Sequence, residues 1–545
     1  MKNNIEILSL GGLRQVGKNC LLIKYGKSAL MIDCGMGFAG NDDFMEDDFF
    51  IPDLEVIKEL DIELKGCVIT HGHEDHIGGI PYLLQQFDIP VFMTPFPKKI
   101  LSERISRIAK YKKNIVTVNQ KENSGFKAGP FEVTMLDVPH SIPEAKALII
   151  KAGGCTIVHS GDFKGMDAAS SPFRKKVPKN VDMFLIDSTN IESEGNSSNE
   201  DSIKKNIETL IENAAGRVIV TGFSSNVARI KNIIEISQKK NRVIGLMGRS
   251  VLSYTGYAKE LGYINLPPSI VTDQAKINRI PENKLTLIVT GSQAETRSIM
   301  KRMSLDMMKS VSVKYGDTII FSSKVIPGNE LSIGRMIDDL VEKGANVFYE
   351  KTDDIHVSGH AKKNDIINAI KDVDPELVIP VHGHRRFLEL LARTAEKEGY
   401  RSRVITDGDL LSYNKKNGEH VSHKYELDTV IVSNYDPDLI DLENIRERKR
   451  IAKAGFMTVM LTVDFLSNVL LCQPRIISAG IAAPHRMKKI EREIRDIIND
   501  YFAHELPEEP YWKDIEEEIR IKTRRYLYSI LKKKPLVHAI IVNLD

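Results

Sequence analysis

The sequence predicts an α/β protein with three parts: a mixed α/β domain, a parallel α/β domain inserted into it, and a small α+β domain at the C-terminus. Apolar strands that end in His or Asp occur in two separate stretches of the chain. Between them, apolar strands alternate with helix-like segments, which is typical of a parallel α/β domain. In the last stretch, strands flank a charged helical segment.

The composition is that of an ordinary globular protein. The 545 residues are 42% hydrophobic and 28% charged, which excludes a disordered, collagenous or disulfide-scaffold chain. This length suggests about three or four domains' worth of material. With 76 basic and 74 acidic residues the net charge is +2, so binding of a polyanion would depend on local patches.

The cysteines and the apolar runs indicate the compartment. The chain has five cysteines, and no pair of them has C-x-x-C spacing; this favours a reducing environment. The N-terminal MKNNIEILSLGG lacks the apolar core of a signal peptide. No run of about 18 apolar residues exists, so no membrane span is expected. We therefore expect a cytoplasmic protein with no membrane contact.

The first domain is expected to place polar residues at one rim of a sheet. Several apolar segments read as strands that end in Gly, His or Asp, and one of them continues through a His-rich loop into a helix that opens near Ile77. Strand ends that carry such residues build one site. The segments are 21–26, 29–37, 65–87, 131–140, 147–163 and 181–190.

The pattern changes at about Ile191. Strands at 216–226, 284–295 and 316–330 end in hydroxyl residues and Gly, where backbone N–H groups can meet phosphate. Residues 376–387 return to the strand-then-histidine style, so the second domain is an insertion. The expected division is 1–190 for the first part of the first domain, 191–355 for the insert, 356–430 for the return segment, 431–453 for a linker and 454–545 for the C-terminal domain.

The clearest chemical motif is H-x-H-x-D-H at residues 71–76. Side chains two apart in an extended loop point the same way, so His71 and His73 can share one ion. Asp75 and His76, one turn further on, can face a second. Imidazole and carboxylate suit Zn²⁺, with Mn²⁺ as a harder alternative. A polar loop with capping residues is the other interpretation, and three His and one Asp in six residues argue against it.

The ordered motifs of the chain resemble the metallo-β-lactamase fold, an αββα sandwich. The matching residues are Asp33 in MIDCG, the motif at 71–76, His140 in DVPHS, Asp162 in HSGDF and His382 in PVHGH. The resemblance implies that one metal is held by His71, His73 and His140, and the other by Asp75, His76 and His382. It implies that Asp162 bridges the metals and that Asp33 orients the loop. Two such ions activate a water and clamp a phosphoryl oxygen.

Motifs in and around the insert resemble one group of proteins within the metallo-β-lactamase fold. Asp187 in IDSTN, the HVSGH segment and PVHGH resemble the three motifs of the β-CASP nucleases. Further motifs resemble bacterial ribonuclease J in its order, from residue 8 to the C-terminus. They are GGLRQVGKNC, IDCGMGF, DSTN, TGFSSNVARI, TGSQAE, SSKVIPGNE and HVSGHA.

This resemblance implies roles beyond metal binding. Asp75, Asp187 and His360 would be catalytic, with His360 contacting the scissile phosphate and protonating the leaving group and Asp187 orienting it. Ser358 and Gly359 would lie against that phosphate. Candidates for a pocket that receives a 5′-monophosphate nucleotide are Ser225, Asn226 and His356. For Ser225 and Asn226, a polar turn after a strand is the alternative.

The chain departs from the family pattern at three positions. His384 stands where the family commonly has Glu, two residues after the last metal-binding His. It is either an alternative ligand or a residue facing the substrate channel. Gln15 replaces a usual Glu and Ala294 a usual Gly.

The function expected from the resemblance is that of a two-metal ribonuclease. It would degrade 5′-monophosphorylated single-stranded RNA in the 5′→3′ direction and also cut internally, in messenger RNA turnover and ribosomal RNA maturation. Two Zn²⁺ per chain are expected, with Mn²⁺ or Mg²⁺ as alternatives. The family implies a homodimer or homotetramer through the C-terminal domain, and an RNA-degradation complex is a further candidate partner.

Two other functions and one surface remain open. A β-CASP DNA nuclease would act on substrates without a 2′-hydroxyl. A non-catalytic RNA-binding scaffold would not need seven metal ligands. Residues 98–113 hold seven Lys or Arg against the single acid Glu103. A solvated amphipathic helix is the favoured interpretation there, and contact with a phosphate backbone is the alternative.

Overall fold

The computed structural model forms two compact units, Met1–Phe38 with Phe49–Val430, and Ala39–Asp48 with Ile431–Asp545. The residues it describes are 4–38, 48–105, 114–118, 125–165, 171–197, 200–308, 311–326, 328–350, 353, 355–433, 436–440 and 442–543. Of the basic stretch 98–113, helix α4 (Pro95–Ile105) covers the first half. Residues 106–113 lie outside the described residues.

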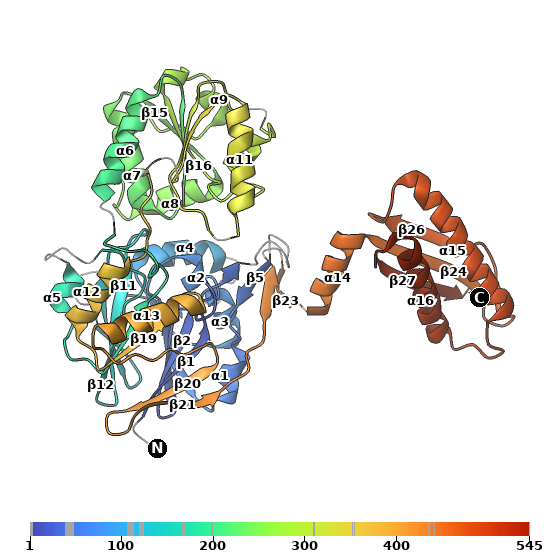
Figure 1. The fold of residues 1–545 in the computed structure, drawn as a ribbon, viewed down its shortest axis with the longest axis horizontal. Helices are drawn as coiled ribbons and strands as arrows, with labels where there is room; N and C mark the ends of the chain where they lie inside the picture. Colours follow the sequence, from blue (N-terminus) through green and yellow to red (C-terminus); the bar gives the residue numbers. More distant parts are fainter. Residues whose placement is uncertain are drawn as a thin grey trace. The chain divides into compact units, whose positions relative to one another are not determined.

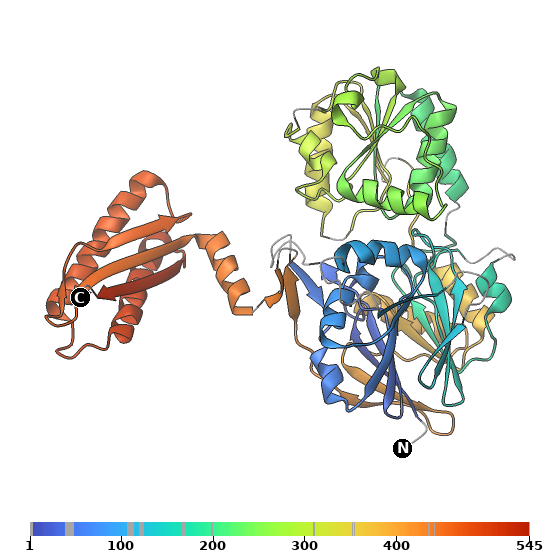
Figure 2. The ribbon, with the colours of Figure 1, turned by 180° about the vertical axis from the view of Figure 1, so that it is seen from behind.

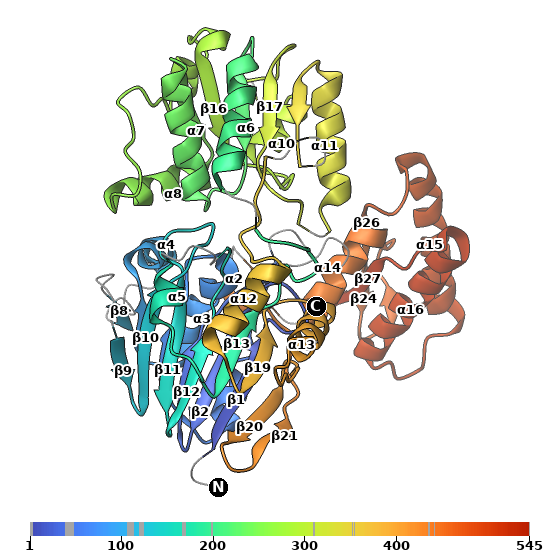
Figure 3. The ribbon, with the colours of Figure 1, turned by 60° about the vertical axis from the view of Figure 1, so that its left-hand side comes forward.

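Two sheets pack face to face in the first unit (Figure 3). One has the strand order β21-β20-β1-β2-β3-β6-β7-β8 and the other β19-β13-β12-β11-β10-β9. Ile7 and Ile23 of the first sheet join Val133 and Ile157 of the second in one buried cluster. The strands of the first sheet are β1 (Ile5–Gly11), β2 (Cys20–Tyr25), β3 (Ser28–Ile32), β6 (Glu63–Val68), β7 (Val91–Met93), β8 (Ile115–Thr117), β20 (Asp409–Asn414) and β21 (Gly418–Lys424). Those of the second are β9 (Gly125–Ala128), β10 (Phe131–Asp137), β11 (Lys146–Ala152), β12 (Cys155–His159), β13 (Met183–Asp187) and β19 (Leu377–Val381).

Helices cover the outer faces of both sheets and complete the predicted αββα sandwich. Ile80 and Leu83 pack with Met31 on the first sheet, and Ile370 and Leu391 pack on the second. The helices are α1 (Glu55–Glu59), α2 (Glu74–Ile77) and α3 (Ile80–Gln86) on one side and α5 (Pro172–Lys176), α12 (Lys363–Val373) and α13 (Arg385–Lys397) on the other. A short pair, β4 (Gly37–Phe38) with β5 (Asp48–Ile51), is antiparallel.

The helix expected to open near Ile77 is instead two helices. The first begins at Glu74 and the second at Ile80. They are separated by Gly78 and Gly79, because Gly79 N donates to Cys34 O at 2.8 Å and ties this point of the chain to the strand-end loop.

The insert is a five-stranded parallel sheet with helices on both faces (Figures 1 and 2). Its order is β15-β16-β14-β17-β18. Because all strands run the same way, their C-terminal ends meet at one edge. The elements are α6 (Glu200–Asn213), β14 (Val218–Thr221), α7 (Val227–Lys239), β15 (Val243–Met247), α8 (Arg249–Glu260), α9 (Gln274–Ile277), β16 (Leu285–Val289), α10 (Ile299–Ser304), β17 (Thr318–Phe321), α11 (Glu330–Glu342) and β18 (Asn346–Phe348). One apolar cluster includes α6, α7 and α8, and another includes α9, α10 and α11.

The second unit is a small α+β fold. Alternate residues of β24 (Phe456–Asp464) are buried, as expected for a sheet covered on one face. α15 (Pro484–His504) and α16 (Trp512–Leu531) supply the covering side chains. β26 (Arg475–Ala479) and β25 (Val469–Leu470) pair antiparallel with β24, and β27 (Leu536–Asn543) pairs parallel. β22 (Val430–Ser433), β23 (Asp436–Ile440) and α14 (Leu442–Ala454) precede them.

No helix among the described residues is long and apolar enough to cross a membrane.

Candidate metal centre

The H-x-H-x-D-H motif follows β6 and is held by backbone contacts with the loop after β3 and with the residue before β2. Cys34 N donates to His76 O at 2.9 Å, and Asn19 N donates to Asp75 O at 2.9 Å. A Cβ on Gly35 would lie 1.6 Å from Asp75 O, so only glycine permits this approach. The glycine in IDCGMG therefore lets α2 lie directly over the loop.

Four side chains converge after the ends of β6, β10 and β12. His71 Nε2 lies 3.0 Å and His140 Nε2 3.1 Å from His73 Nδ1. Asp162 Oδ2 is 3.7 Å from His71 Nε2 and 3.9 Å from His140 Nε2. We call these four residues the first set.

A second group lies on the other side of the same carboxylate. Asp75 Oδ2 is 3.5 Å from His76 Nε2 and 3.6 Å from His382 Nε2. Asp162 Oδ2 is 3.3 Å from His76 Nε2 and 3.4 Å from His382 Nε2. Asp75, His76, His382 and the shared Asp162 are the second set. The carboxylate of Asp162 thus stands between two groups of imidazoles.

The geometry of both sets fits divalent cations. Zinc with Zn–N of about 2.0–2.1 Å in a tetrahedral site puts neighbouring nitrogens about 3.3 Å apart, close to the 3.0 and 3.1 Å found in the first set. Burial lowers the pKa of His73 to about 4, and burial likewise lowers the pKa of His71 and His140. These rings are therefore neutral, the form that binds metal. Both ring nitrogens of buried His382 lack a hydrogen-bond partner within the described part of the chain.

Outer hydrogen bonds orient the imidazoles. His76 Nδ1 lies 2.8 Å from Asp33 Oδ2, and His140 Nδ1 donates to Gly359 O at 2.7 Å. Such bonds leave the opposite nitrogen, Nε2, free for a metal. Asp33 and His382 adopt left-handed φ values of 58° and 55°; strained backbone of this kind clusters at functional sites.

Half-buried His360 pairs with the buried Asp187 beside the two sets. His360 Nδ1 is 2.7 Å from Asp187 Oδ2 and 3.9 Å from Asp162 Oδ2. Burial alone would lower the pKa of His360, but the carboxylates of Asp187 and Asp162 outweigh it and raise that pKa to about 9. Thr189 fixes the other oxygen of Asp187 through its N–H and its hydroxyl, at 2.9 and 2.7 Å.

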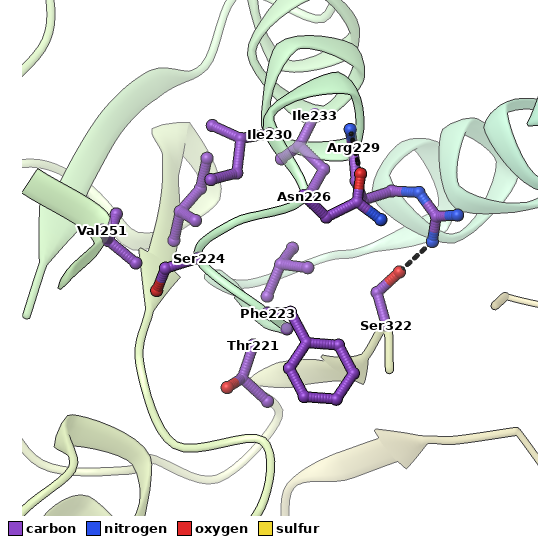
Figure 4. A pocket seen from close by; sticks show the side chains of 12 residues that line it. Thr221, Phe223, Ser224, Asn226, Arg229, Ile230, Ile233, Val251 and Ser322 are labelled. Atoms are coloured by element: carbon purple, nitrogen blue, oxygen red, sulfur yellow. Dashed lines mark hydrogen bonds between the residues drawn. The ribbon is translucent and has the colours of Figure 1, made fainter. Parts of the chain in front are cut away.

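The residues expected in the 5′-monophosphate pocket occupy different environments. Ser225 Oγ lies 3.2 Å from His73 Nε2, so this loop of the insert reaches the metal centre. Asn226 caps α7, and its side-chain oxygen accepts from Arg229 N at 3.1 Å (Figure 4). His356 is largely buried, its Nδ1 has no partner among the described residues, and burial lowers its pKa to about 4. The binding roles of these residues remain predictions.

The HVSGH segment also approaches the metal centre. Ser358 Oγ accepts from His360 N at 3.1 Å. A Cβ on Gly359 would lie 2.9 Å from His140 Cε1 and 3.1 Å from Ser141 Oγ, so glycine is required for this contact.

Two residues near the cluster were not expected from the sequence. Asn19 Nδ2 lies 3.3 Å from Asp75 Oδ2 and 3.1 Å from His76 Nε2. His159 lines the same cavity as His76 and Asp162, and its Nδ1 accepts from Gly161 N at 3.0 Å. Asn19 stands in the GKNC motif and His159 in HSGDF, but nothing in their spacing distinguishes them from ordinary polar residues at strand ends.

His384 and Ala294, two of the positions where the chain departs from the family pattern, do not belong to either ligand set. His384 Nδ1 is 3.3 Å from Arg14 O, its ring packs edge-on against Phe387, and the residue caps α13. Ala294 has a left-handed φ of 59°, the conformation for which glycine is the usual residue.

Comparison with known proteins identifies the family. The model "Metallo-beta-lactamase superfamily" matches residues 13–168, and "Ribonuclease J, beta-CASP domain" matches 215–340. "Zn-dependent metallo-hydrolase RNA specificity domain" matches 349–405, and "Ribonuclease J C-terminal domain" matches 443–544. Ribonuclease J of Helicobacter pylori is 31% identical over 98% of this chain and 79% of its own length. The chain belongs to the ribonuclease J family. Ribonuclease J of Mycolicibacterium smegmatis is 36% identical over 91% of both chains, and that of Synechocystis is 30% identical over 98% of this chain and 86% of its own.

A solved structure shares the fold alone. The crystal structure of a protein of unknown function from Enterococcus faecalis superposes with a TM-score of 0.55 at 16% identity, over 75% of this chain and 100% of the other. The predicted fold class and family are therefore confirmed. As a member of the ribonuclease J family the chain is a metal-dependent ribonuclease of the β-CASP group, and RNA is its substrate.

Proposed function

We propose that this ribonuclease holds two Zn²⁺ ions, with Mn²⁺ or Mg²⁺ as alternatives, and hydrolyses single-stranded RNA. It removes nucleotides 5′→3′ from a 5′-monophosphorylated end and also cuts internally. The observation that carries this proposal is the placement of Asp162 Oδ2 within 3.9 Å of His71, His76, His140 and His382 nitrogens, with the His360–Asp187 pair alongside. Such a site presents two cation positions and one proton donor to a single phosphate.

In the reaction, the first and second sets hold the ions. Once bound, two such ions lower the pKa of a water and offset the negative charge that develops on a phosphoryl oxygen. His360 is the general acid: with a pKa of about 9 it is protonated at neutral pH, and it donates this proton to the departing 3′ oxygen. Asp187 holds the imidazolium in place through its 2.7 Å contact. The product retains a 5′ phosphate.

The segment that returns from the insert supports binding of the scissile phosphate. Ser358 and Gly359 precede His360, and Gly359 O accepts from His140 Nδ1. Ser225, Asn226 and His356 are proposed to receive the 5′-terminal monophosphate, and Ser225 connects this region to the metal centre through its 3.2 Å contact with His73 Nε2. A monophosphate there would place the first linkage of the RNA at the metal centre.

The proposed cellular setting is the one that the resemblance to the family implies. Messenger RNA turnover and ribosomal RNA maturation in the cytoplasm, alone or within an RNA-degradation complex, are the proposed roles. A homodimer or homotetramer through the C-terminal domain is the proposed assembly. Relatives that match over nearly the whole of this chain are named ribonuclease J. This likeness supports the proposal that the chain has the roles of that enzyme.

End-labelled single-stranded RNA tests the proposal. Purified protein is incubated with RNA carrying a 5′ monophosphate or a 5′ hydroxyl, with Zn²⁺ or Mn²⁺, beside His76→Ala. The expected result is metal-dependent release of mononucleotides, faster from the monophosphate and absent in the variant. Internal cuts alone, or equal rates from both ends, would overturn the 5′→3′ assignment.

A further inference from the structure

A row of charged side chains joins the sandwich to the insert beside the metal centre. Lys164 Nζ lies 2.7 Å from Glu200 Oε1, and Arg229 Nη2 lies 3.0 Å from Glu200 Oε2. Lys164 belongs to the sandwich and follows Asp162 by two residues, whereas Glu200 begins α6 and Arg229 lies on α7. One carboxylate therefore holds a cation from each domain.

The second terminal nitrogen of the Arg229 guanidinium binds the segment that returns to the sandwich. Its Nη1 donates to Ile355 O at 2.8 Å and to Ser322 Oγ, a bond drawn in Figure 4. Ser322 Oγ in turn donates to Ile355 O at 2.8 Å. Ile355 directly precedes residues 356–360, which end in His360. The place of this segment therefore depends on how Arg229 is held.

Burial makes this link stiffer than a surface ion pair. Arg229 is 3% exposed, and a buried guanidinium requires a paired charge. Burial alone would raise the pKa of Glu200, but Arg229 and Lys164 outweigh it and hold that pKa below its usual value. The carboxylate is therefore charged at neutral pH, and both of its oxygens are occupied.

A second ion pair between the two domains offers a matched control. Lys99 of α4 contacts Glu260 of α8. Their side chains are 41% and 58% exposed, and ion pairs this exposed contribute little. Glu260 is the last residue of α8, on a different helix from either Glu200 or Arg229.

We propose that Glu200 is a positioning residue for catalysis: it ties Lys164 of the sandwich to Arg229, and through Arg229 it sets the place of His360 over the metal centre. This inference rests on the proposed function, in which His360 protonates the leaving 3′ oxygen. Misplacing a catalytic group by about 1 Å can cost on the order of 10²-fold in rate. Loss of the Glu200 charge should therefore reduce kcat far more than it changes KM.

A substrate that needs no general acid separates positioning from general stability. Two 5′-monophosphorylated RNAs are compared, with the first linkage carrying either the normal 3′ oxygen or a bridging 3′ sulfur, which leaves as a thiolate without a proton. The rate of each variant is divided by the rate of wild type on the same RNA, so that the oxygen and sulfur substrates can be compared. Metal content and melting temperature are measured for each variant.

His360→Ala is expected to lose activity on the oxygen substrate and to regain it on the sulfur substrate. Glu200→Gln should lower kcat about 10- to 100-fold on oxygen, with less than about a threefold change in KM, and should approach wild type on sulfur. Lys164→Gln, which breaks the link from the other side, should follow Glu200→Gln. Glu260→Gln should match wild type on both.

Two results would overturn the inference in different ways. If sulfur rescues His360→Ala but not Glu200→Gln or Lys164→Gln, Glu200 has no positioning role toward His360 and only this inference fails. If sulfur does not rescue His360→Ala, the proton-donor role in the proposed function fails, and the inference fails with it.

Discussion

Replacing Asp33 with Asn should weaken binding of a divalent cation by the second set. The Asp33 side chain is buried and accepts three hydrogen bonds, from Thr70 N at 2.7 Å, Thr70 Oγ1 at 2.8 Å and His76 Nδ1 at 2.8 Å. An Asn side chain has the same shape, and its oxygen can still accept the hydrogen bond from Thr70 N. Its NH₂ group then replaces the oxygen that faces the N–H group of His76 Nδ1. Two donors then face each other, and the imidazole of His76 loses its anchor.

The size of this effect follows from the lost bond. A hydrogen bond to a charged group contributes about 1.5–3 kcal/mol, and changes to such outer partners reduce metal affinity by about 10- to 100-fold. A 100-fold change in dissociation constant corresponds to about 2.8 kcal/mol, so the two estimates agree. The first set should be affected less, because none of its imidazoles contacts Asp33 directly. His140 and His73 contact Gly359 O and Ser225 Oγ, and His71 Nδ1 reaches Asp33 only through Thr70 Oγ1, at 3.1 Å.

Isothermal titration of metal-free protein with Zn²⁺ measures this effect. Two binding steps are expected for wild type. In Asp33→Asn the dissociation constant of one step, that of the second set, should rise about 10- to 100-fold. Asp53→Asn is the control, since Asp53 is also a buried carboxylate and accepts from Glu55 N at 3.1 Å and Asp428 N at 2.9 Å. Unchanged constants in Asp33→Asn, or equal shifts in both variants, would refute the reasoning.

Four further outcomes are expected. Gly359→Ala should lower activity at least about tenfold, because its Cβ would lie 2.9 Å from His140 Cε1; unchanged steady-state rates would contradict the close contact. His382→Ala should lose one metal per chain by elemental analysis, whereas His384→Ala should keep its metals, and the reverse would reassign the ligand. Removal of metal with EDTA should lower the melting temperature, and added Zn²⁺ should restore it. Each occupied site raises the free energy of unfolding by up to about 4 kcal/mol when free Zn²⁺ is 1,000 times the dissociation constant; a melting temperature that does not change with Zn²⁺ would argue against a site. The Glu200 carboxyl has a lowered pKa when folded, so its stabilisation is present above its unfolded pKa of about 4.3 and is lost as pH falls through the folded value; the difference in urea midpoint between wild type and Glu200→Gln should therefore be present at pH 7 and shrink at acid pH.

Much of the metal centre could be predicted because its spacing is local. His71, His73, Asp75 and His76 lie within six residues after a strand. Alternation in an extended loop places His71 and His73 together, and Asp75 and His76 follow one turn further on. The remaining ligands could be chosen only by their order in a family pattern. The family pattern selected His382 and left His384, which follows the same strand, as an alternative ligand; the structure brings His382 to the cluster and leaves His384 at the N-terminus of α13.

The contacts that hold the centre could not be predicted, because they join residues far apart in the chain. His73 meets Ser225 across 152 positions. Neither Glu200 nor Lys164 lies in a sequence motif that would predict their ion pair. Such pairs depend on the packing of the insert against the sandwich.

The sequence predicted the layers of helices and sheets in each domain, but it did not predict the order of the strands within a sheet. Strand–helix alternation indicated a parallel insert, but the order β15-β16-β14-β17-β18 depends on which crossovers skip a strand. The split of the helix near Ile77 was missed because two consecutive glycines can sit within one helix or between two. Their role became visible only through the contact of Gly79 with the loop at Cys34.

The most direct test of the central claim is anomalous diffraction at the zinc edge from crystals grown with Zn²⁺. Two peaks about 3.5–4 Å apart are expected, one within the first set and one within the second, with Asp162 between them. A single peak, or a second peak bound by His384 in place of His382, would contradict the claim.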